Sequence, residues 1–400
     1  MKVAIVVIAY KRHLSLNRLL NSIEKAEVDG NADLIISLEG NSSKEVIDEA
    51  EAFSSPKFNK VLIKRKEQLG LRKHIIACGD LVNNYDGIII LEDDLLVDRY
   101  FYLYAKASLG FYKHSENIAG VALYSHEYNE FANLPFRPMH NGFDTYPIQV
   151  PCSWGQCWSR QQWHGFKNWY LDKTKESLDQ IVGLPEQVKA WPESSWKKYF
   201  HGYMVENDLY FMYPYVSLST NCSDAGGTHI ASESNLHQVC LPAQKRPMPN
   251  FSFCPADFME VSYDAFFEPN GDFLYRFLKF NRDRISIDIQ GIKPEKIILK
   301  KELCLTSKKV TKYESSYPLR FKPVEFNLEF PTKEKLELNL CKSVDVLLDS
   351  KKKFSFYQYY IGMSLINKSI LLSYSSALIK KLSNKILKYL NSTNNCNTRP

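Results

Sequence analysis

The sequence predicts an α/β fold in which a mostly parallel sheet occupies the first part of the chain. Short β-branched runs alternate with helical patterns over about the first 125 residues, and polar residues follow directly where several of these runs end. Alternation of this kind is typical of parallel strands with helices on both faces of the sheet. We therefore expect one large α/β domain, followed by smaller units.

The individual elements follow from hydrophobic periodicity and from β-branched content. Strands are expected at Val3–Ile8, Leu34–Leu38, Val61–Lys64, Ile88–Leu91 and Ile118–Leu123. Helices are expected at Leu14–Lys25, Lys44–Phe53, Arg72–Asn83 and Arg99–Lys113.

The chain of 400 residues is too long for one ordinary hydrophobic core, so we expect three parts. Residues 1–245 form the predicted α/β domain, whose second half is irregular and aromatic. Residues 246–350 are predicted to form a small β-rich accessory module, with strand-like runs at Ile285–Ile289, Ile297–Lys300, Phe326–Phe330 and Leu336–Leu340. Residues 351–400 are predicted to form a basic, amphipathic helical tail.

The chain has a net charge of +6, and its positive excess comes from this tail. Residues 351–400 hold eight Lys and one Arg without Asp or Glu, which leaves −3 for residues 1–350. Such a tail fits either a helix packed on the protein itself or a surface helix attracted to anionic lipid. No nucleic-acid partner is expected.

The N-terminal apolar run, Val3 to Ala9, is predicted to be a strand and not a signal peptide, because Lys11, Arg12 and His13 follow at once without a cleavage site. No run approaches the ~20 apolar residues of a membrane-spanning helix. The expected location is therefore the cytoplasm. The nine cysteines lack paired zinc spacing and are expected to be reduced.

Three carboxylates stand together where the fourth predicted strand ends, at Glu92, Asp93 and Asp94. In open α/β sheets ligands bind beyond the carboxyl ends of the strands. Adjacent carboxylates repel one another unless a cation lies among them, and Mg²⁺ or Mn²⁺ prefers such oxygen ligands. In the alternative interpretation, Asp94 or Asp98 caps the following helix.

These motifs are similar to those of a known enzyme family. The stretch LGLRKHIIACG at 69–79 and the stretch IIILEDDLLVD at 88–98 resemble GT-A-fold glycosyltransferases, particularly the N-acetylglucosaminyltransferase I type and bacterial family-two-like enzymes. The similarity runs from residue 1 to about residue 230. It implies a Rossmann-like GT-A catalytic domain that uses a nucleotide sugar.

The resemblance also implies roles for single residues. Asp94 would bind Mn²⁺ or Mg²⁺, and His229 after the Gly-rich turn is a second candidate metal ligand. The implied donor-binding residues are Tyr10, Arg12, Glu39, Arg72, Lys73, Glu92 and Asp93.

The segment PCSWGQCW at 151–158 resembles the acceptor loop of the family, so Trp154 is the expected contact to an acceptor sugar, with a core position as the alternative. An inverting transfer also needs a general base. Asp208 is favoured and Glu206 is the second choice, with Glu193 a distant third.

The resulting hypothesis is a metal-dependent, inverting glycosyltransferase that moves a sugar from a UDP-sugar to a glycan or a lipid-linked saccharide in surface polysaccharide synthesis. The basic tail would hold it at the inner face of the membrane. Two alternatives stay open. One is a nucleotidyltransferase, although a Gly-rich loop after the first strand is missing. The other is a non-catalytic carbohydrate-binding protein on a degenerate transferase fold.

Overall fold

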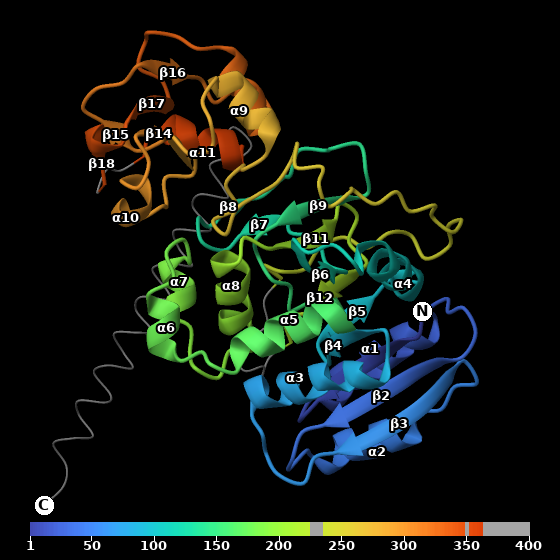
Figure 1. Ribbon diagram of the computed structural model, residues 1–400. Coiled ribbons are helices and arrows are strands. Elements are labelled where there is room, and N and C mark those ends of the chain that lie inside the picture. Colours follow the sequence, from blue (N-terminus) through green and yellow to red (C-terminus); the bar gives the residue numbers. More distant parts are fainter. Residues whose placement is uncertain (225–234, 349–351, 363–400) are drawn as a thin grey trace, which may run out of the picture. The chain divides into compact units, whose positions relative to one another are not determined.

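The computed structural model of the protein describes residues 1–224, 235–348 and 352–362. The described residues up to 348 belong to one compact unit, and residues 352–362 belong to a second. The predicted mostly parallel α/β sheet is confirmed in the first unit, which is built on an eight-stranded mixed sheet (Figure 1). Its strand order is β3-β2-β1-β4-β10-β6-β11-β9.

The first half of this sheet comes from the alternating part of the sequence. Its strands are β1 Val3–Ala9, β2 Ala32–Leu38, β3 Phe58–Lys64 and β4 Gly87–Glu92, all parallel to their neighbours. The connecting helices are α1 His13–Glu24, α2 Lys44–Ala52 and α3 Leu71–Gly79, with the short 3₁₀ helix η1 at Asp80–Asn84. Every residue of β1 is buried, as expected for a strand covered on both faces.

The second half mixes directions. After β5 Leu95–Val97, α4 Phe101–Tyr112 and β6 Ile118–Ala122, the chain forms the hairpin of β7 Tyr128–Asn129 and β8 Leu134–Pro135. The next elements are β9 Thr145–Ile148, β10 Gln156–Ser159, α5 Arg160–Tyr170, α6 Lys175–Asp179, α7 Glu186–Lys189, α8 Trp196–Glu206, β11 Tyr210–Pro214 and β12 Ser219–Asn221. Strand β10 lies antiparallel between β4 and β6.

Two hydrophobic layers cover the sheet. Helices α1, α2 and α4 supply Leu16, Val46 and Leu109 to one layer. Helices α3, α5 and α8 supply residues such as Trp163 and Phe200 to the other. The eight cysteines that the structure describes are free thiols. Within the described ranges, no helix combines the length and the apolar character required to cross a bilayer.

Residues 272–347 carry further helices and a second sheet. The elements are α9 Asp272–Leu278, β13 Ile285–Asp288, α10 Glu295–Ile298, β14 Leu303–Thr306, β15 Lys309–Val310, β16 Ser315–Tyr317, η2 Val324–Glu329, β17 Leu338–Lys342, η3 Ser343–Asp345 and β18 Val346–Leu347. Strands β13, β14, β17 and β16 form a four-stranded sheet, and β15 pairs with β18. In the second unit, α11 spans Phe354–Ile361, and most of the predicted tail lies outside the described residues.

Two predicted strands of this region are wrong. Residues 297–300 fall at the end of α10 and residues 326–330 fall in and just after η2. The physical reason in the second case is Asn327, whose side chain accepts from the amides of Arg320 (2.7 Å) and Phe321 (2.9 Å) and donates to the Val324 carbonyl (2.9 Å). Backbone groups satisfied locally in this way have no need of a neighbouring strand.

Candidate active site at the end of strand β4

The acidic turn follows a strand that is buried in the middle of the sheet. Residues 88–91 of β4 are fully buried, and Asp93 and Asp94 follow immediately before β5. Because β1 runs parallel beside β4, with Ile8 opposite Glu92, the residues after β1 reach the same edge of the sheet. This register explains why Arg12 meets the acidic turn.

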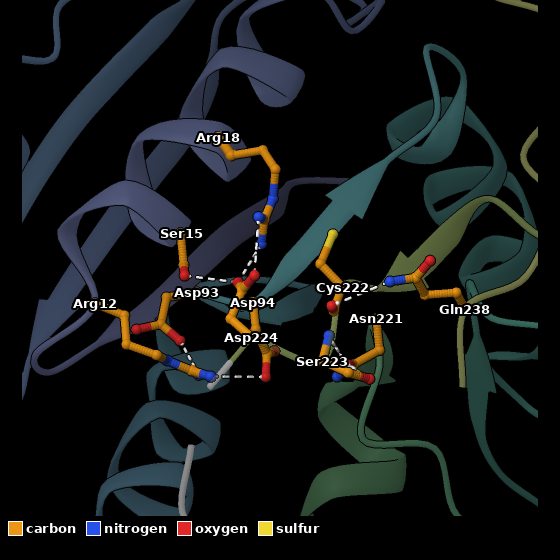
Figure 2. Close-up of polar contacts among 10 residues, drawn as sticks. All are labelled: Arg12, Ser15, Arg18, Asp93, Asp94, Asn221, Cys222, Ser223, Asp224 and Gln238. Atoms are coloured by element: carbon orange, nitrogen blue, oxygen red, sulfur yellow. Dashed lines mark hydrogen bonds and ion pairs between the residues drawn. The ribbon is translucent and has the colours of Figure 1, made fainter. Parts of the chain in front are cut away.

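Arg12 bridges two of the three carboxylates (Figure 2). Its Nη1 donates to Oδ2 of Asp94 at 3.1 Å, and its Nη2 pairs with Oδ1 of Asp93. Burial lowers the pKa of Arg12, but the charges of Asp93 and Asp94 outweigh burial and raise it overall. The guanidinium is therefore a permanent positive charge at this edge of the sheet.

One arginine does not neutralise three acids. Burial, followed by the charges of Asp94 and Asp93, raises the pKa of Glu92 to about 8. Burial also raises the pKa of Asp93 to about 6, although Arg12 opposes this. In addition, Oδ1 of Asp94 is buried and has no hydrogen-bond partner within the described part of the chain. The turn therefore has unsatisfied negative charge and a free oxygen, which are the properties of a cation site.

A segment from the far end of the domain runs beside the turn. Strand β12 pairs antiparallel with β5, and the amide of Cys222 donates to the Asp94 carbonyl at 2.9 Å. Asp224 ties the end of this segment to α1, because its carboxylate accepts from Ser15 Oγ (2.6 Å) and Arg18 Nη1 (3.1 Å; Figure 2). These contacts fix Asn221 next to the acidic turn.

A pocket of about 420 Å³ opens over the turn. It brings together side chains from both halves of the sheet and from the loop before α8. The lining residues are Arg12, Leu71, Glu92, Asp94, Glu130, Ser153, Trp154, Trp191, Pro192, Ser195, Trp196, Lys197, Asn221 and His237.

The residues present fit a hard divalent cation that is shared with phosphate. Within the described ranges, no three His, Cys, Asp or Glu side chains gather as a complete ligand set. Mg²⁺ commonly takes one or two carboxylates and completes its shell with phosphate oxygens and water. Asp94 Oδ1 and the neighbouring Glu92 can supply that protein share.

The pocket is lined by four of the predicted site residues, Arg12, Glu92, Asp94 and Trp154. Asp93 is not a lining residue, but it forms an ion pair with Arg12, which is one. The predicted ligand His229 lies outside the described residues.

Glu39 is buried and its carboxylate is already engaged. Oε1 accepts from the amides of Gly40 and Leu69, and Oε2 accepts from the amide of Gly70, each at 2.9 Å. Gly40 approaches the backbone of residue 67 so closely that a Cβ would lie 2.1 Å from a carbonyl carbon. Glu39 therefore shapes the loop that leads to Leu71, a pocket residue.

The other predicted donor-binding residues lie outside the pocket lining. The Tyr10 ring is covered by the Lys11 ammonium, 4.6 Å from its centroid. Arg72 stacks on the ring of Tyr199 at 4.7 Å and pairs with Glu193 at 3.5 Å. Lys73 is exposed on α3.

The structure does not bring Glu206 and Asp208 to the pocket, which argues against either as the base. Glu206 ends α8, roughly 14 Å along the helix from Lys197, and pairs with Lys173 at 2.7 Å. Asp208, at a left-handed φ of 51°, accepts from Gln149 at 2.6 Å. Both residues therefore lie at the C-terminal end of α8, whereas the pocket is lined by its first turn.

Several pocket residues were missed by the sequence analysis. Asn221 stands at the end of β12, so the strand-end rule could have identified it. Glu130, Trp191, Lys197 and His237 come from irregular segments and from the first turn of α8, where no sequence pattern marks them.

No protein-family model matches the chain, and no curated protein matches it in sequence. Among solved structures, the chain is similar to S. aureus TarS residues 1–349 in complex with UDP-GlcNAc (TM-score 0.37, 11% identity, 58% of this chain and 62% of that one). It is also similar to S. aureus TarS (0.33, 12%, 54% and 37%) and to the mannosyltransferase PcManGT from Pyrobaculum calidifontis in complex with GDP-Man and Mn²⁺ (0.30, 11%, 40% and 45%). The chain thus spans less than two thirds of the length of each of these proteins. At TM-scores below 0.5, a function for this chain has to come from its own residues.

Proposed function

We propose that the protein is a metal-dependent, inverting glycosyltransferase that transfers a sugar from a UDP-sugar to a glycan or a lipid-linked saccharide. The observation that carries this proposal is the buried Oδ1 of Asp94, which has no hydrogen-bond partner among the described residues, at a pocket that also contains Glu92, Arg12 and Trp154. Unpaired carboxylate oxygen beside a guanidinium suits a diphosphate that arrives with its own cation.

The acidic turn is the donor end of the pocket. Asp94 and Glu92 would hold Mn²⁺ or Mg²⁺, which when bound neutralises charge on the leaving diphosphate. Arg12 provides a fixed positive charge on the same side, held in place by Asp93. Glu39 contributes by fixing the backbone of the loop before Leu71.

The aromatic wall is the acceptor end. Trp154 lines the pocket and packs edge-on against Tyr124, with centroids 4.6 Å apart and planes at 62°. A flat ring that is held in this way can stack on the apolar face of a sugar. Trp154 is therefore our proposed acceptor contact.

Nucleotide release from the purified full-length protein tests the proposal without knowledge of the acceptor. A panel of UDP-, GDP-, CMP- and dTDP-sugars is incubated with Mn²⁺ or with EDTA, and we expect metal-dependent release from one UDP-sugar. Asp94→Asn should lower that release by about 10²-fold or more. The matched control is Asp86→Asn, which changes an exposed acid at the opposite end of β4 and should leave the rate unchanged.

Undiminished metal-dependent release by Asp94→Asn would contradict the metal assignment. No release and no thermal stabilisation by any nucleotide would favour the non-catalytic carbohydrate-binding alternative.

The proposed setting is surface polysaccharide synthesis at the inner face of the membrane. Support comes from the basic sequence of residues 351–400, where each Lys near an anionic surface contributes about 1 kcal/mol. Changing Lys380, Lys381, Lys385 and Lys388 to Gln should strongly reduce sedimentation of the full-length protein with phosphatidylserine vesicles. Equal sedimentation of variant and parent would rule out this tail as the anchor.

A further inference from the structure

The pocket has one carboxylate that does not belong to the acidic turn. Among its described lining residues, Glu92 and Asp94 stand at the end of β4, whereas Glu130 comes from the loop between β7 and β8. The Glu130 side chain is 27% exposed, so a bound molecule can reach it.

The loop that carries Glu130 is fixed by hydrogen bonds of a buried side chain, Asn129. Asn129 is fully buried, and its Oδ1 accepts from the amides of Phe131 (2.8 Å) and Ala132 (3.2 Å). Its Nδ2 donates to the carbonyl of Phe266 at 3.1 Å. These bonds close a tight turn around Glu130 and fix the direction in which its side chain leaves the backbone.

Lys197 holds the carboxylate at the pocket wall. Its Nζ lies 3.4 Å from Oε1 of Glu130 and 5.4 Å from the ring centroids of both Trp154 and Trp191. The lysine is 9% exposed and sits in the first turn of α8. Among the described residues, Lys197 is the one hydrogen-bond partner of the Glu130 carboxylate, so the second oxygen is left for a ligand.

The other acids near this wall are already engaged. Both oxygens of Glu193 have partners, because Oε2 accepts from Tyr199 at 2.5 Å and Oε1 accepts from Lys198 at 3.2 Å. Glu206 is the last residue of α8, and Asp208 lies just beyond that end of the helix. Among the described acids at the aromatic wall, Glu130 is therefore the one with an oxygen open to a ligand.

We propose, on the basis of the function proposed above, that Glu130 is the general base of the transfer. The acceptor O–H bond breaks and its proton passes to the Glu130 carboxylate. The acceptor oxygen forms a bond to the anomeric carbon of the donor sugar. The bond from that carbon to the diphosphate oxygen breaks, and its electron pair leaves with the diphosphate. Glu130 then releases its proton to water.

Azide tests this role in the full-length protein, because it is an ionised nucleophile that needs no base. The readout is UDP release from UDP-GlcNAc, or from the UDP-sugar that the panel identifies, with Mn²⁺. Glu130→Gln should lower release to water by about 10²-fold or more. Sodium azide should restore release and yield a glycosyl azide of inverted configuration, while UDP binding by calorimetry stays at the parent value.

The matched control is Glu127→Gln, which changes an exposed carboxylate just before the same hairpin and should behave like the parent protein. Unchanged release by Glu130→Gln would overturn the proposal, and so would a loss that azide does not restore in a variant that still binds UDP. Failure of the parent protein to bind UDP with Mn²⁺ would instead overturn the proposed function itself.

Discussion

Glu325 is a buried acid whose replacement should change how stability depends on pH. It lies in η2, is 4% exposed, and accepts one hydrogen bond from the hydroxyl of Tyr263 at 3.3 Å. Burial raises the pKa of Glu325 from 4.5 to about 7, and the hydrogen bonds oppose only part of that effect. The folded protein therefore prefers the neutral carboxyl group.

The sign and the size of the effect follow from linkage. Between pH 4.5 and 7 the folded protein keeps a proton on Glu325 that the unfolded chain releases, so rising pH destabilises the fold. Below this window the group contributes nothing, and above it the cost is complete. Each pH unit corresponds to about 1.4 kcal/mol, so the full cost is about 3 kcal/mol.

Glu325→Gln keeps the shape and removes the titration. We expect the difference in free energy of unfolding, variant minus parent, to rise by about 3 kcal/mol between pH 4.5 and 8. Urea unfolding followed by tryptophan fluorescence measures it. Glu329→Gln, at an exposed position of the same helix, is the control and should show no such rise. A pH-independent difference for Glu325→Gln would refute the reasoning.

Two further predictions concern stability. Gly40→Ala should cost about 1 to 3 kcal/mol because the new Cβ meets backbone at 2.1 Å, whereas Gly110→Ala in α4, where the nearest atom is 3.9 Å away, should be neutral or stabilising by up to about 1 kcal/mol. Equal thermal midpoints for the two would contradict this. Arg246→Ala removes both 2.7 Å bonds to the fully buried Asp98 and should cost about 3 kcal/mol. Arg284→Ala, which breaks an exposed ion pair, should cost less than about 1 kcal/mol, and urea titrations that ranked the two the other way would refute the argument.

The sheet could be predicted because the sequence of each of its first strands shows a recognisable apolar run. A run such as Ile88 to Leu91 is apolar throughout, and this pattern requires cover on both faces. The parallel order then places the ends of β1 and β4 together, so the meeting of Arg12 with Asp93 and Asp94 follows from local patterns.

The opposite wall of the pocket could not be predicted in this way. Glu130 directly follows β7, a strand of only two residues. Lys197 lies on α8, and the sequence of this helix indicates only that the helix packs on the sheet. Their meeting depends on how α8 and the hairpin pack against the sheet, and no local pattern encodes that distance. For the same reason, the sequence alone did not show that Glu206 ends α8, away from the pocket lining.

Strand β10 has a consequence for how the sheet assembles. It separates β4 from β6, although residues 156–159 are synthesised long after β4. Until they arrive, the apolar edge of Ile88–Leu91 has no neighbour on that side, and such edges recruit other chains. Pairing across so long a stretch of sequence also slows folding. The protein is therefore most prone to aggregate during synthesis, before Gln156–Ser159 closes the gap in its central sheet.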